Sequence, residues 1–289
     1  MRSVLITGGA GFIGRALVDR FTERHWRAIA AGRHRPPDLP SAAEWRAYDL
    51  ASPQVPSDLF AGVDALVHAA YAKEDFDVNV DGSSVLLEAA RRAGVKQIVF
   101  LSSLAAHAHA RSRYGKQKYV LEKLFDARGA LVVRPGLVLG DGGIFAAMCG
   151  YLRHHRFVPL IDGGAQPLQT VHIDDLTDAI VDATDEGRIG TYTVAEREPI
   201  SYRQFYRNLG ARLGAGVTFV PVPFPLADAA VRAASVLRIR LPIDRDNLLG
   251  LAAMHVDRGP RLQPTGRSIG DFRSNIERAV EVGRRHRSG

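Results

Sequence analysis

The chain has one cysteine, Cys149, in 289 residues, and this excludes an internal disulfide framework and fits a reducing compartment. It also lacks any apolar run of membrane-spanning length. The apolar segment near the N-terminus is broken by glycines within a few residues, which argues against a signal peptide. We therefore expect a cytoplasmic protein with no membrane partner.

Acidic residues are in deficit, with 31 Asp and Glu against 38 Lys and Arg, a formal net charge of +7. Such a charge is compatible with nucleic-acid binding, but no basic motif interleaved with aromatic residues is present. The arginines are scattered, except in Arg33-His34-Arg35 and in the tail at 284–287. An arginine-rich solvated surface is the favoured interpretation, without a nucleic-acid partner, and it would attract an anionic cofactor or substrate.

Glycines concentrate in one informative stretch, Val4 to Gly14, which reads VLITGGAGFIG. It begins as a short apolar strand, passes through Gly8, Gly11 and Gly14, and continues into an amphipathic helix from about Arg15 to Glu23. Such glycines allow a sharp turn, the approach of a pyrophosphate to the backbone, and close packing of helix on strand. The strand–glycine–helix context favours a dinucleotide-binding loop over an ordinary glycine turn, with phosphates at the helix N-terminus.

The second strand, residues 27–32, is followed by Arg33, nineteen positions after Gly14. In a dinucleotide-binding unit this position lies at the adenosine ribose, where an acid selects NAD(H) and an arginine accommodates a 2′-phosphate. The first acid after this strand is Asp38. Because a guanidinium suits a phosphate by charge and by its forked donors, we predict NADP(H) over NAD(H), the alternative being a surface arginine.

Strand and helix patterns alternate through the first half, which predicts a Rossmann-type, doubly wound parallel sheet covered on both faces. Further strands are expected at 45–50, 64–70, 97–103 and 130–136, with helices at 75–93 and from Tyr114 onward. Asp49-Leu50, Ala69-Ala70 and the paired serines Ser102-Ser103 end three of these strands. Ligands of such sheets bind at the carboxyl ends of the strands. These three pairs of residues are expected at those ends.

Asn79 and His68 are two further polar side chains in this half. Asn79, in the helix at 75–93, is suited to bonding backbone or to ordering water near the site, or is simply solvated. His68 has no partner at metal-ligand spacing and is expected to be a packed histidine at a strand end.

The second half is less regular. Helices are expected at 144–155, 202–213, 225–237 and 269–283, and strands at 171–173, 190–194 and near 217–220, with Asp174 capping the helix after the first of these strands. We predict that residues 1–136 plus about 168–195 form the Rossmann domain. Residues of about 137–167 and 196–289 then form a smaller C-terminal substrate-binding lobe.

Ser103, Tyr114 and Lys118 form the candidate catalytic set. Tyr114 and Lys118 are four residues apart and so share one helical face. A tyrosine phenol is a poor acid–base group at neutral pH, but a nearby ammonium stabilises its phenolate and lowers its pKa. Ser103 can donate a hydrogen bond to a substrate oxygen, and a bound nicotinamide would exchange the hydride. A tyrosine four residues before a lysine is common, and such a pair alone would be interpreted as incidental. Here the pair follows a dinucleotide-binding motif and a strand that ends in serines, and this context favours a catalytic role.

Together these stretches resemble the extended or atypical short-chain dehydrogenases/reductases of the NAD(P)-dependent epimerase/dehydratase type, over roughly residues 1–180. The matching segments are Thr7–Gly14, Asp49-Leu50, Asp64–Ala70, Asn79–Gly82, Phe100–Ser103, Tyr114–Lys118, Arg134–Gly136 and Val171–Leu176. The resemblance implies a Rossmann fold and a Ser–Tyr–Lys set, with Ser103 as the acting serine and Ser102 as the fallback. The cofactor-binding residues predicted in all are Thr7, Gly8, Gly11, Phe12, Ile13, Gly14, Arg33, Asp49, Leu50, Ala69, Ala70, Asn79, Ser102, Lys118, Pro135 and Gly136.

The segment between Ser103 and Tyr114 departs from the nucleotide-sugar epimerases of that family. It is shorter than theirs and carries His107 and His109, which puts a nucleotide-sugar substrate in doubt. A metal site at these two histidines is not expected, because no further ligand is evident.

Three functions are compatible with the sequence. The first is an NADP(H)-dependent ketoreductase, which Arg33 favours. The second is a nucleotide-sugar epimerase or dehydratase that retains NAD(P). The third is a non-catalytic NADP(H)-binding sensor or assembly factor, against which the intact Ser103, Tyr114 and Lys118 count. A small-molecule substrate is expected, and a homodimer is left open.

Overall fold

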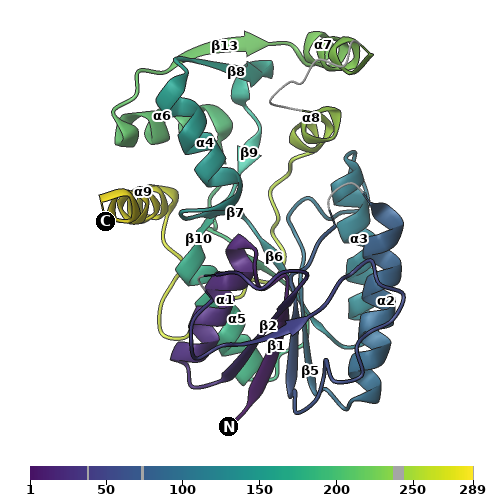
Figure 1. The fold of residues 1–289 in the computed structure, drawn as a ribbon. Helices are drawn as coiled ribbons and strands as arrows, with labels where there is room; N and C mark the ends of the chain where they lie inside the picture. The colour runs from purple at the N-terminus through teal and green to yellow at the C-terminus, as the bar shows by residue number, and fades with distance from the viewer. Residues whose placement is uncertain (38, 73–74, 237–243, 289) are drawn as a thin grey trace.

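A computed structural model describes residues 1–37, 39–72, 75–236 and 244–288 (Figure 1). Its first half contains β1 (Ser3–Thr7), α1 (Phe12–Glu23), β2 (Arg27–Gly32), β3 (Glu44–Ala47), β4 (Ala65–His68), α2 (Phe76–Arg92), β5 (Gln97–Leu101), α3 (Arg113–Asp126) and β6 (Leu131–Pro135). Its second half contains β7 (Leu137–Leu139), α4 (Gly143–His154), β8 (Phe157–Ile161), η1 (Asp162–Gly164), β9 (Pro167–Leu168), β10 (Thr170–His172), α5 (Ile173–Asp185), β11 (Gly190–Val194), β12 (Ile200–Ser201), α6 (Tyr202–Leu213), β13 (Thr218–Val222), α7 (Phe224–Val236), α8 (Arg245–Ala252) and α9 (Phe272–Ser288).

Seven strands form one parallel sheet in the order β11-β6-β5-β4-β1-β2-β3, so the expected Rossmann-type architecture is confirmed. The chain adds β2 and β3 on one side of β1, and then β4, β5, β6 and β11 on the other. The direction of winding therefore reverses at the β1–β4 pair. In open α/β sheets a ligand crevice forms beyond the carboxyl ends of the strands at this reversal.

Side chains alternate across the sheet and so bury both faces. Val4 and Ile6 of β1 pack in a core with α1 and α5, whereas Leu5 points to the core under α2. A further cluster, which includes Phe100 and Phe125, fastens α3. Figure 1 shows α1 and α5 on one face and α2 and α3 on the other, the arrangement that right-handed crossovers between parallel strands produce.

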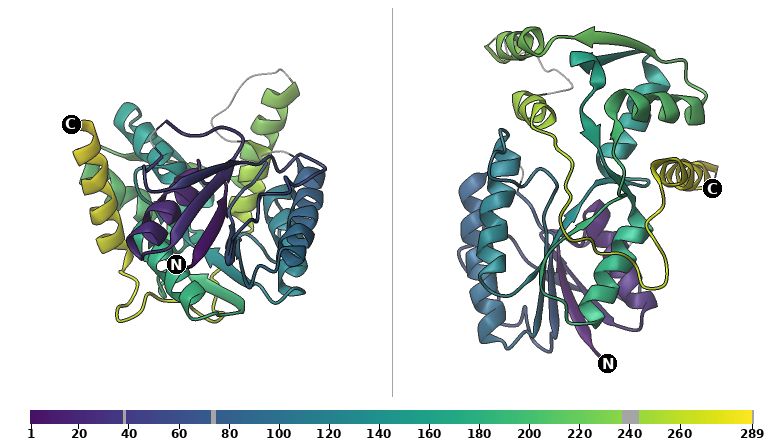
Figure 2. Two further views of the ribbon diagram at one scale, coloured as in Figure 1. Left: turned by 60° about the horizontal axis from the view of Figure 1, so that its bottom comes forward. Right: turned by 180° about the vertical axis from the view of Figure 1, so that it is seen from behind.

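Of the elements after β6, β11 joins the sheet and α5 packs on its face. Among the others, α4, β8, α6 and β13 lie over the carboxyl end of the sheet (Figures 1 and 2). Their core joins α4, β8, α6 and α9, with Phe145 and Phe205 fully buried. Small two-stranded sheets pair β10 with β7, β12 with β9 and β13 with β8. The division into a Rossmann domain of 1–136 plus about 168–195 and a smaller lobe stays a prediction.

Several element boundaries differ from expectation. Helix α1 begins at Phe12, three residues before the expected start, because Gly11 is its N-cap and the glycine loop closes within a single turn. Helix α5 is capped by His172 and not by Asp174: the His172 ring accepts the Asp174 N–H at 3.3 Å. The final helix begins at Phe272 and not at Ile269, since Asp271 accepts the Ser274 N–H. The helix expected at 225–237 is α7, and Leu237 lies outside the described residues.

Candidate active site

The glycine loop is packed backbone against backbone. Gly8 has φ +72°, and a Cβ there would lie 2.8 Å from the Ala70 nitrogen and 2.9 Å from the Ala69 carbonyl. A Cβ on Gly14 would lie 2.1 Å from the Gly8 oxygen. The N-cap Gly11 brings no side chain to the first turn of α1. The loop therefore has room only for main chain and presents an uncapped helix start, a combination that fits a dinucleotide pyrophosphate.

Phe12 and Ile13, the first two residues of α1, pack against different parts of the structure. The Phe12 ring packs against the turn after β7: a Cβ on Gly142 would lie 2.4 Å from its Cδ2 and a Cβ on Gly140 2.7 Å from its Cζ. Ile13 packs against the core shared by α1 and α5. Phe12 thus ties the loop to the segment that leads into α4.

A second close approach brings α2 to the end of the third strand. A Cβ on Gly82 would lie 2.1 Å from the Leu50 oxygen, so the helix contacts this turn through its backbone. Leu50 is buried, whereas Asp49 is exposed and its Oδ1 accepts the Ala51 N–H at 3.0 Å. Arg33 is exposed directly after β2. Asp38, the acid considered in the sequence, lies outside the described residues.

His68 is a packed strand-end histidine, as predicted. Its Nδ1 lies 2.7 Å from the Thr7 hydroxyl and its Nε2 3.0 Å from the Ser83 hydroxyl, and its ring stacks on Phe125. Complete burial lowers its pKa to about 3, so the imidazole is neutral at physiological pH. The Thr7 hydroxyl also accepts the Ala70 N–H at 3.4 Å. Through His68 and Ala70, Thr7 therefore joins the carboxyl end of β1 to that of β4.

Asn79 holds the segment that follows β4. Its Oδ1 accepts the Ala72 N–H at 2.8 Å, and its Nδ2 donates to the Ala72 and Asp75 carbonyls at 2.7 and 2.5 Å. The side chain is buried and bonded to main chain at both ends. This geometry favours the first of the two roles considered for Asn79, backbone bonding, over the ordering of water.

Ser103, Tyr114 and Lys118 come together at the carboxyl edge of the sheet. Ser103 follows β5 by two residues, and its hydroxyl lies close enough to the Tyr114 side chain to lower the pKa of that phenol. Lys118 is buried, and its Nζ donates to the Leu101 carbonyl at 2.8 Å and lies 6.0 Å from the centroid of the Tyr114 ring. The three side chains are therefore neighbours, as the sequence predicted.

The electrostatics of this trio differ from the sequence-based expectation. Burial raises the pKa of Tyr114, and the nearby Ser103 hydroxyl opposes that shift in part. Burial also lowers the pKa of Lys118 to about 8, against the attraction of Glu122. In this geometry desolvation outweighs the stabilisation of a phenolate by Lys118, because the amine is bonded to Leu101 and not to the phenol.

Tyr71 was missed by sequence reasoning. It directly follows Ala70, packs edge-on against Tyr114 with ring centroids 5.3 Å apart, and places its ring 5.2 Å from Lys118 Nζ. Burial is the main reason that its pKa rises to about 12. Because Ala70 contacts Gly8, Tyr71 completes a chain of contacts from the glycine loop to Tyr114. In the sequence, the feature that could have indicated Tyr71 is its position directly after Ala69-Ala70, the predicted end of a strand.

The start of α3 is held from the C-terminal part of the chain. Asp246 of α8 accepts the backbone N–H of Arg113 and, at 3.2 Å, that of Tyr114. The Ser112 hydroxyl caps the same turn through the Gly115 N–H at 3.0 Å. A carboxylate at a helix N-terminus is favoured by the helix dipole. Since 132 residues separate Tyr114 from Asp246, no local pattern reveals this contact.

The Ser102 side chain is bonded to Glu122. Its hydroxyl donates to the buried Glu122 carboxylate at 2.6 Å, and Glu122 is bonded in turn to Arg134. Pro135 is the last residue of β6 and Gly136 follows it, and both are buried. A Cβ on Gly136 would lie 2.5 Å from the Gln169 oxygen. These contacts make Ser103 the strand-end serine next to Tyr114, while cofactor contacts for Ser102, Pro135 and Gly136 stay predictions.

The two histidines of the short rim take different positions. The His107 ring lies edge-on to His255, with centroids 4.4 Å apart, and burial is the main cause that lowers its pKa. His109 is exposed. Among the described residues, no group of three or more His, Cys, Asp or Glu is placed to hold a metal ion.

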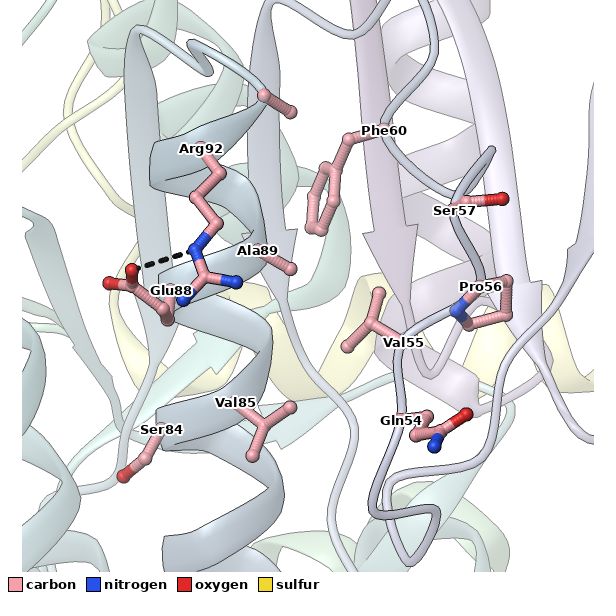
Figure 3. Close-up of a pocket in the computed structure, with 11 residues that line it drawn as sticks. Gln54, Val55, Pro56, Ser57, Phe60, Ser84, Val85, Glu88, Ala89 and Arg92 are labelled. Carbon is pink, nitrogen blue, oxygen red and sulfur yellow. Dashed lines mark hydrogen bonds and ion pairs between the residues drawn. The ribbon is translucent and has the colours of Figure 1, made fainter.

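A groove of about 810 Å³ lies elsewhere, between α2 and residues 54–60 (Figure 3). Figure 3 shows Val55 and Phe60 facing Val85 and Ala89, with Glu88 bonded to Arg92 at its edge. Its lining includes none of the candidate catalytic or cofactor-binding residues. This groove is therefore separate from the candidate catalytic residues Ser103, Tyr114 and Lys118. In the part of the chain that is described, no helix is long and apolar enough to cross a membrane.

A parallel sheet with a glycine loop at β1 and a Ser–Tyr–Lys cluster at β5 and α3 defines a dinucleotide-binding α/β protein. Residues 4–195 match the model of the NAD dependent epimerase/dehydratase family. The chain belongs to that family.

Its relatives include reductases. A ceramide reductase of Caulobacter vibrioides is 27% identical over 237 residues, which cover 77% of this chain and 74% of that protein. A 2-alkyl-3-oxoalkanoate reductase of Stenotrophomonas maltophilia is 27% identical over 252 residues, 73% of this chain and 76% of that protein. An uncharacterized protein of Mycobacterium tuberculosis is 26% identical over 215 residues, and the match spans only 23% of its length.

Solved structures confirm the fold. A UDP-glucose 4-epimerase from Thermotoga maritima, determined with UDP-glucose, superposes with a TM-score of 0.75 at 21% identity, over 98% of this chain and 99% of that one. The NAD-dependent NDP-hexosamine 5,6-dehydratase TunA superposes with a TM-score of 0.73 at 18% identity, over 100% and 99% of the two chains. At these identities the likeness shows the architecture alone.

Proposed function

We propose that this chain is an NADP(H)-dependent oxidoreductase of the ketoreductase type, which moves a hydride between nicotinamide and a carbonyl or hydroxyl carbon. The observation that supports it most is the position of the Tyr114 side chain beside the Ser103 hydroxyl and the buried Lys118. The contacts of Gly8 with Ala70, and of Tyr71 with Tyr114, link this trio to the glycine loop. A cofactor that lies across the loop would therefore reach Tyr114.

Residues of this chain fit such a cofactor. The glycine loop and the start of α1 would hold the pyrophosphate, and Lys118 the nicotinamide ribose. When bound, the cofactor supplies or accepts the hydride, which no side chain can do. Tyr114 would donate a proton to the carbonyl oxygen of the substrate, and Ser103 would orient that oxygen by a hydrogen bond. Lys118 is bonded to the Leu101 carbonyl and not to the phenol, so its proposed role is to hold the ribose and not to lower the pKa of Tyr114.

NADP(H) is the proposed cofactor because Arg33 is exposed at the end of β2, where the 2′-substituent of the adenosine ribose lies in this fold. The reductase names of two relatives support reduction as the physiological direction. They also guide the choice of substrates, so that ceramide-type and 2-alkyl-3-oxoalkanoate ketones belong in the first test panel.

Family membership favours a second candidate, an epimerase or dehydratase that keeps its NAD(P) through the reaction cycle. The short rim with His107 and His109 counts against a nucleotide-sugar substrate. Absorbance of the purified protein near the nicotinamide band separates the two candidates. Retained cofactor supports the second, and freely exchanging cofactor supports the first.

Replacing Tyr114 with Phe tests the catalytic assignment. The variant keeps the ring that packs on Tyr71 but loses the exchangeable proton, so turnover should fall at least about 100-fold. NADPH affinity, measured by fluorescence titration, should remain within about twofold of wild type, because Tyr114 is assigned no cofactor contact. Tyr119→Phe, in the same helix, is the matched control and should keep full turnover. Unchanged turnover of the Tyr114→Phe variant would overturn the assignment.

A further inference from the structure

Glu122 is a buried carboxylate on the same helical face as the candidate catalytic residues. It follows Lys118 by four residues and Tyr114 by eight, and it is 3% exposed. An ionised carboxylate is costly to bury unless it is paired and fully hydrogen-bonded. Helix packing does not require an acid at this position, because an apolar residue would fill the buried face of the helix equally well. What Glu122 binds is therefore informative.

Both oxygens of Glu122 are engaged. Oε1 accepts the Ser102 hydroxyl at 2.6 Å and Arg134 Nε at 2.7 Å, and Oε2 accepts Arg134 Nη2 at 2.5 Å. The pair with Arg134 is bidentate, the geometry that gives the most directional ion pairs. Ser102 precedes Ser103, and its own N–H donates to the Val133 carbonyl at 2.7 Å. Glu122 thus holds the turn at the end of β5 that carries Ser103.

The network continues across the sheet. Arg134 Nη1 lies 3.5 Å from Asp257 Oδ2, which accepts the Thr193 hydroxyl at 2.7 Å. Asp257 belongs to the segment that follows α8, and its N–H donates to Gln169 Oε1 at 3.0 Å. Because Arg134 shares its charge between two carboxylates, Glu122 is not fully neutralised by it. Part of the field of Glu122 therefore reaches Lys118, one helical turn away.

We propose that Glu122 is a positioning residue for the Ser103–Tyr114–Lys118 site, which fixes the Ser103 turn through Ser102 and acts as the counter-charge of the Lys118 ammonium. The inference rests on the proposed function. The groups that face Lys118 or Glu122 from the surrounding elements are His68, Tyr71, Ser102, Tyr114 and Arg134. His68 is neutral, and burial raises the pKa of Tyr71 and Tyr114. Glu122 is the one carboxyl group of this set, and it is paired with Arg134.

The counter-charge role can be measured without a substrate. The sequence has lysines only at 73, 96, 116, 118 and 123, so the protein labelled with 13Cε-lysine gives few signals, and Lys118→Met assigns one of them. In wild type the Lys118 signal should titrate near the pKa of about 8 that burial produces. In Glu122→Gln it should titrate lower by about one pH unit, because the charged amine loses its anion.

Two further variants make this result specific. Asp126→Asn removes an exposed carboxylate from the same helix and should leave the Lys118 titration unchanged. Arg134→Gln removes a cation from the network and should shift the titration upward, opposite to Glu122→Gln, and it gives an answer even if Glu122→Gln fails to fold. A Lys118 titration that coincides with wild type in either network variant overturns the counter-charge role.

The positioning role is read from turnover with a ketone of the panel. Ser102→Ala keeps the Glu122 charge but releases the turn, so kcat should fall about tenfold with the Lys118 titration unmoved. An unchanged kcat overturns this role. If Tyr114→Phe stays active while the Lys118 titration shifts as described, the proposed function fails and the electrostatic coupling stands. If Tyr114→Phe is inactive and the Lys118 titration is unchanged in Glu122→Gln and in Arg134→Gln, the counter-charge role is rejected while the proposed function stands.

Discussion

Burial of charge distinguishes the candidate site from the rest of α3. Lys118 and Glu122 are each almost fully buried, whereas Lys116 and Asp126 of the same helix are exposed. An amine moved out of water loses part of its preference for the charged form, which brings the Lys118 pKa to about 8. A lysine poised near neutrality responds to small changes around it, such as an anionic cofactor or a nearby carboxylate.

Arg33 provides the prediction for cofactor choice. Arg33→Ala should raise the KM for NADPH about tenfold and leave that for NADH nearly unchanged, because a charge-assisted contact with the 2′-phosphate is lost and NADH has no such group. Initial-rate kinetics with both cofactors measure this. Arg128→Ala, an exposed arginine after α3, is the control. A wild type that prefers NADH would contradict the proposal, as would equal effects of Arg33→Ala on both cofactors.

At the scale of elements, the site depends on close approaches of backbone. Gly8 meets the tip of β4, Gly82 meets the turn after β3, and Gly115 would place a Cβ 2.4 Å from the Ala105 oxygen. Each contact brings a helix or loop against the carboxyl edge of the sheet, where a side chain would push the two apart. Glycine spacing in the sequence predicted the loop that contains Gly8, and the contact partners of all three glycines came only from the tertiary structure.

Two helical glycines give a matched test of this packing. Gly82→Ala in α2 should lower the free energy of unfolding by about 1–3 kcal/mol, because its Cβ would overlap the Leu50 carbonyl. Gly150→Ala in α4 has no atom within 4 Å of the new Cβ and should raise it by up to about 1 kcal/mol through helix propensity. Urea denaturation of both variants measures the difference. Equal effects at the two sites would show that α2 does not press on this turn.

At the scale of the whole molecule, helix α5 joins segments that are distant in the sequence. Its carboxylates meet arginines of α1, of α9 and of the segment between α8 and α9: Asp178 pairs with Arg20 and Arg24 at 3.3 Å, and Asp175 with Arg278 at 2.9 Å. Exposed ion pairs contribute little singly, but several that share buried carboxylates set how the C-terminal segments dock. These arginines are therefore used in packing on α5.

Glu196 makes the stability of the chain depend on pH. It follows β11, accepts the Thr170 N–H at 2.8 Å and lies near Asp271 and Phe272, and burial raises its pKa from 4.5 to about 7. Between these two pH values the folded state binds more protons than the unfolded state, so stability should fall as the pH rises through that window. Glu196→Gln should flatten this dependence in thermal melts from about pH 5 to pH 8. The exposed Glu198→Gln should keep the wild-type slope, and a slope retained by Glu196→Gln would contradict the assignment.

Local patterns determined much of this protein. The glycine loop, the strand–helix alternation and the Tyr114–Lys118 face depend on residues within one or two turns of each other, where backbone geometry is set by the sequence nearby. Tertiary structure alone decided that Ser102 turns toward Glu122, that Tyr71 abuts Tyr114, and that Asp246 caps α3. These contacts join residues up to 132 positions apart, and burial, which sets the charge state of Lys118, exists only once the sheet and helices have packed.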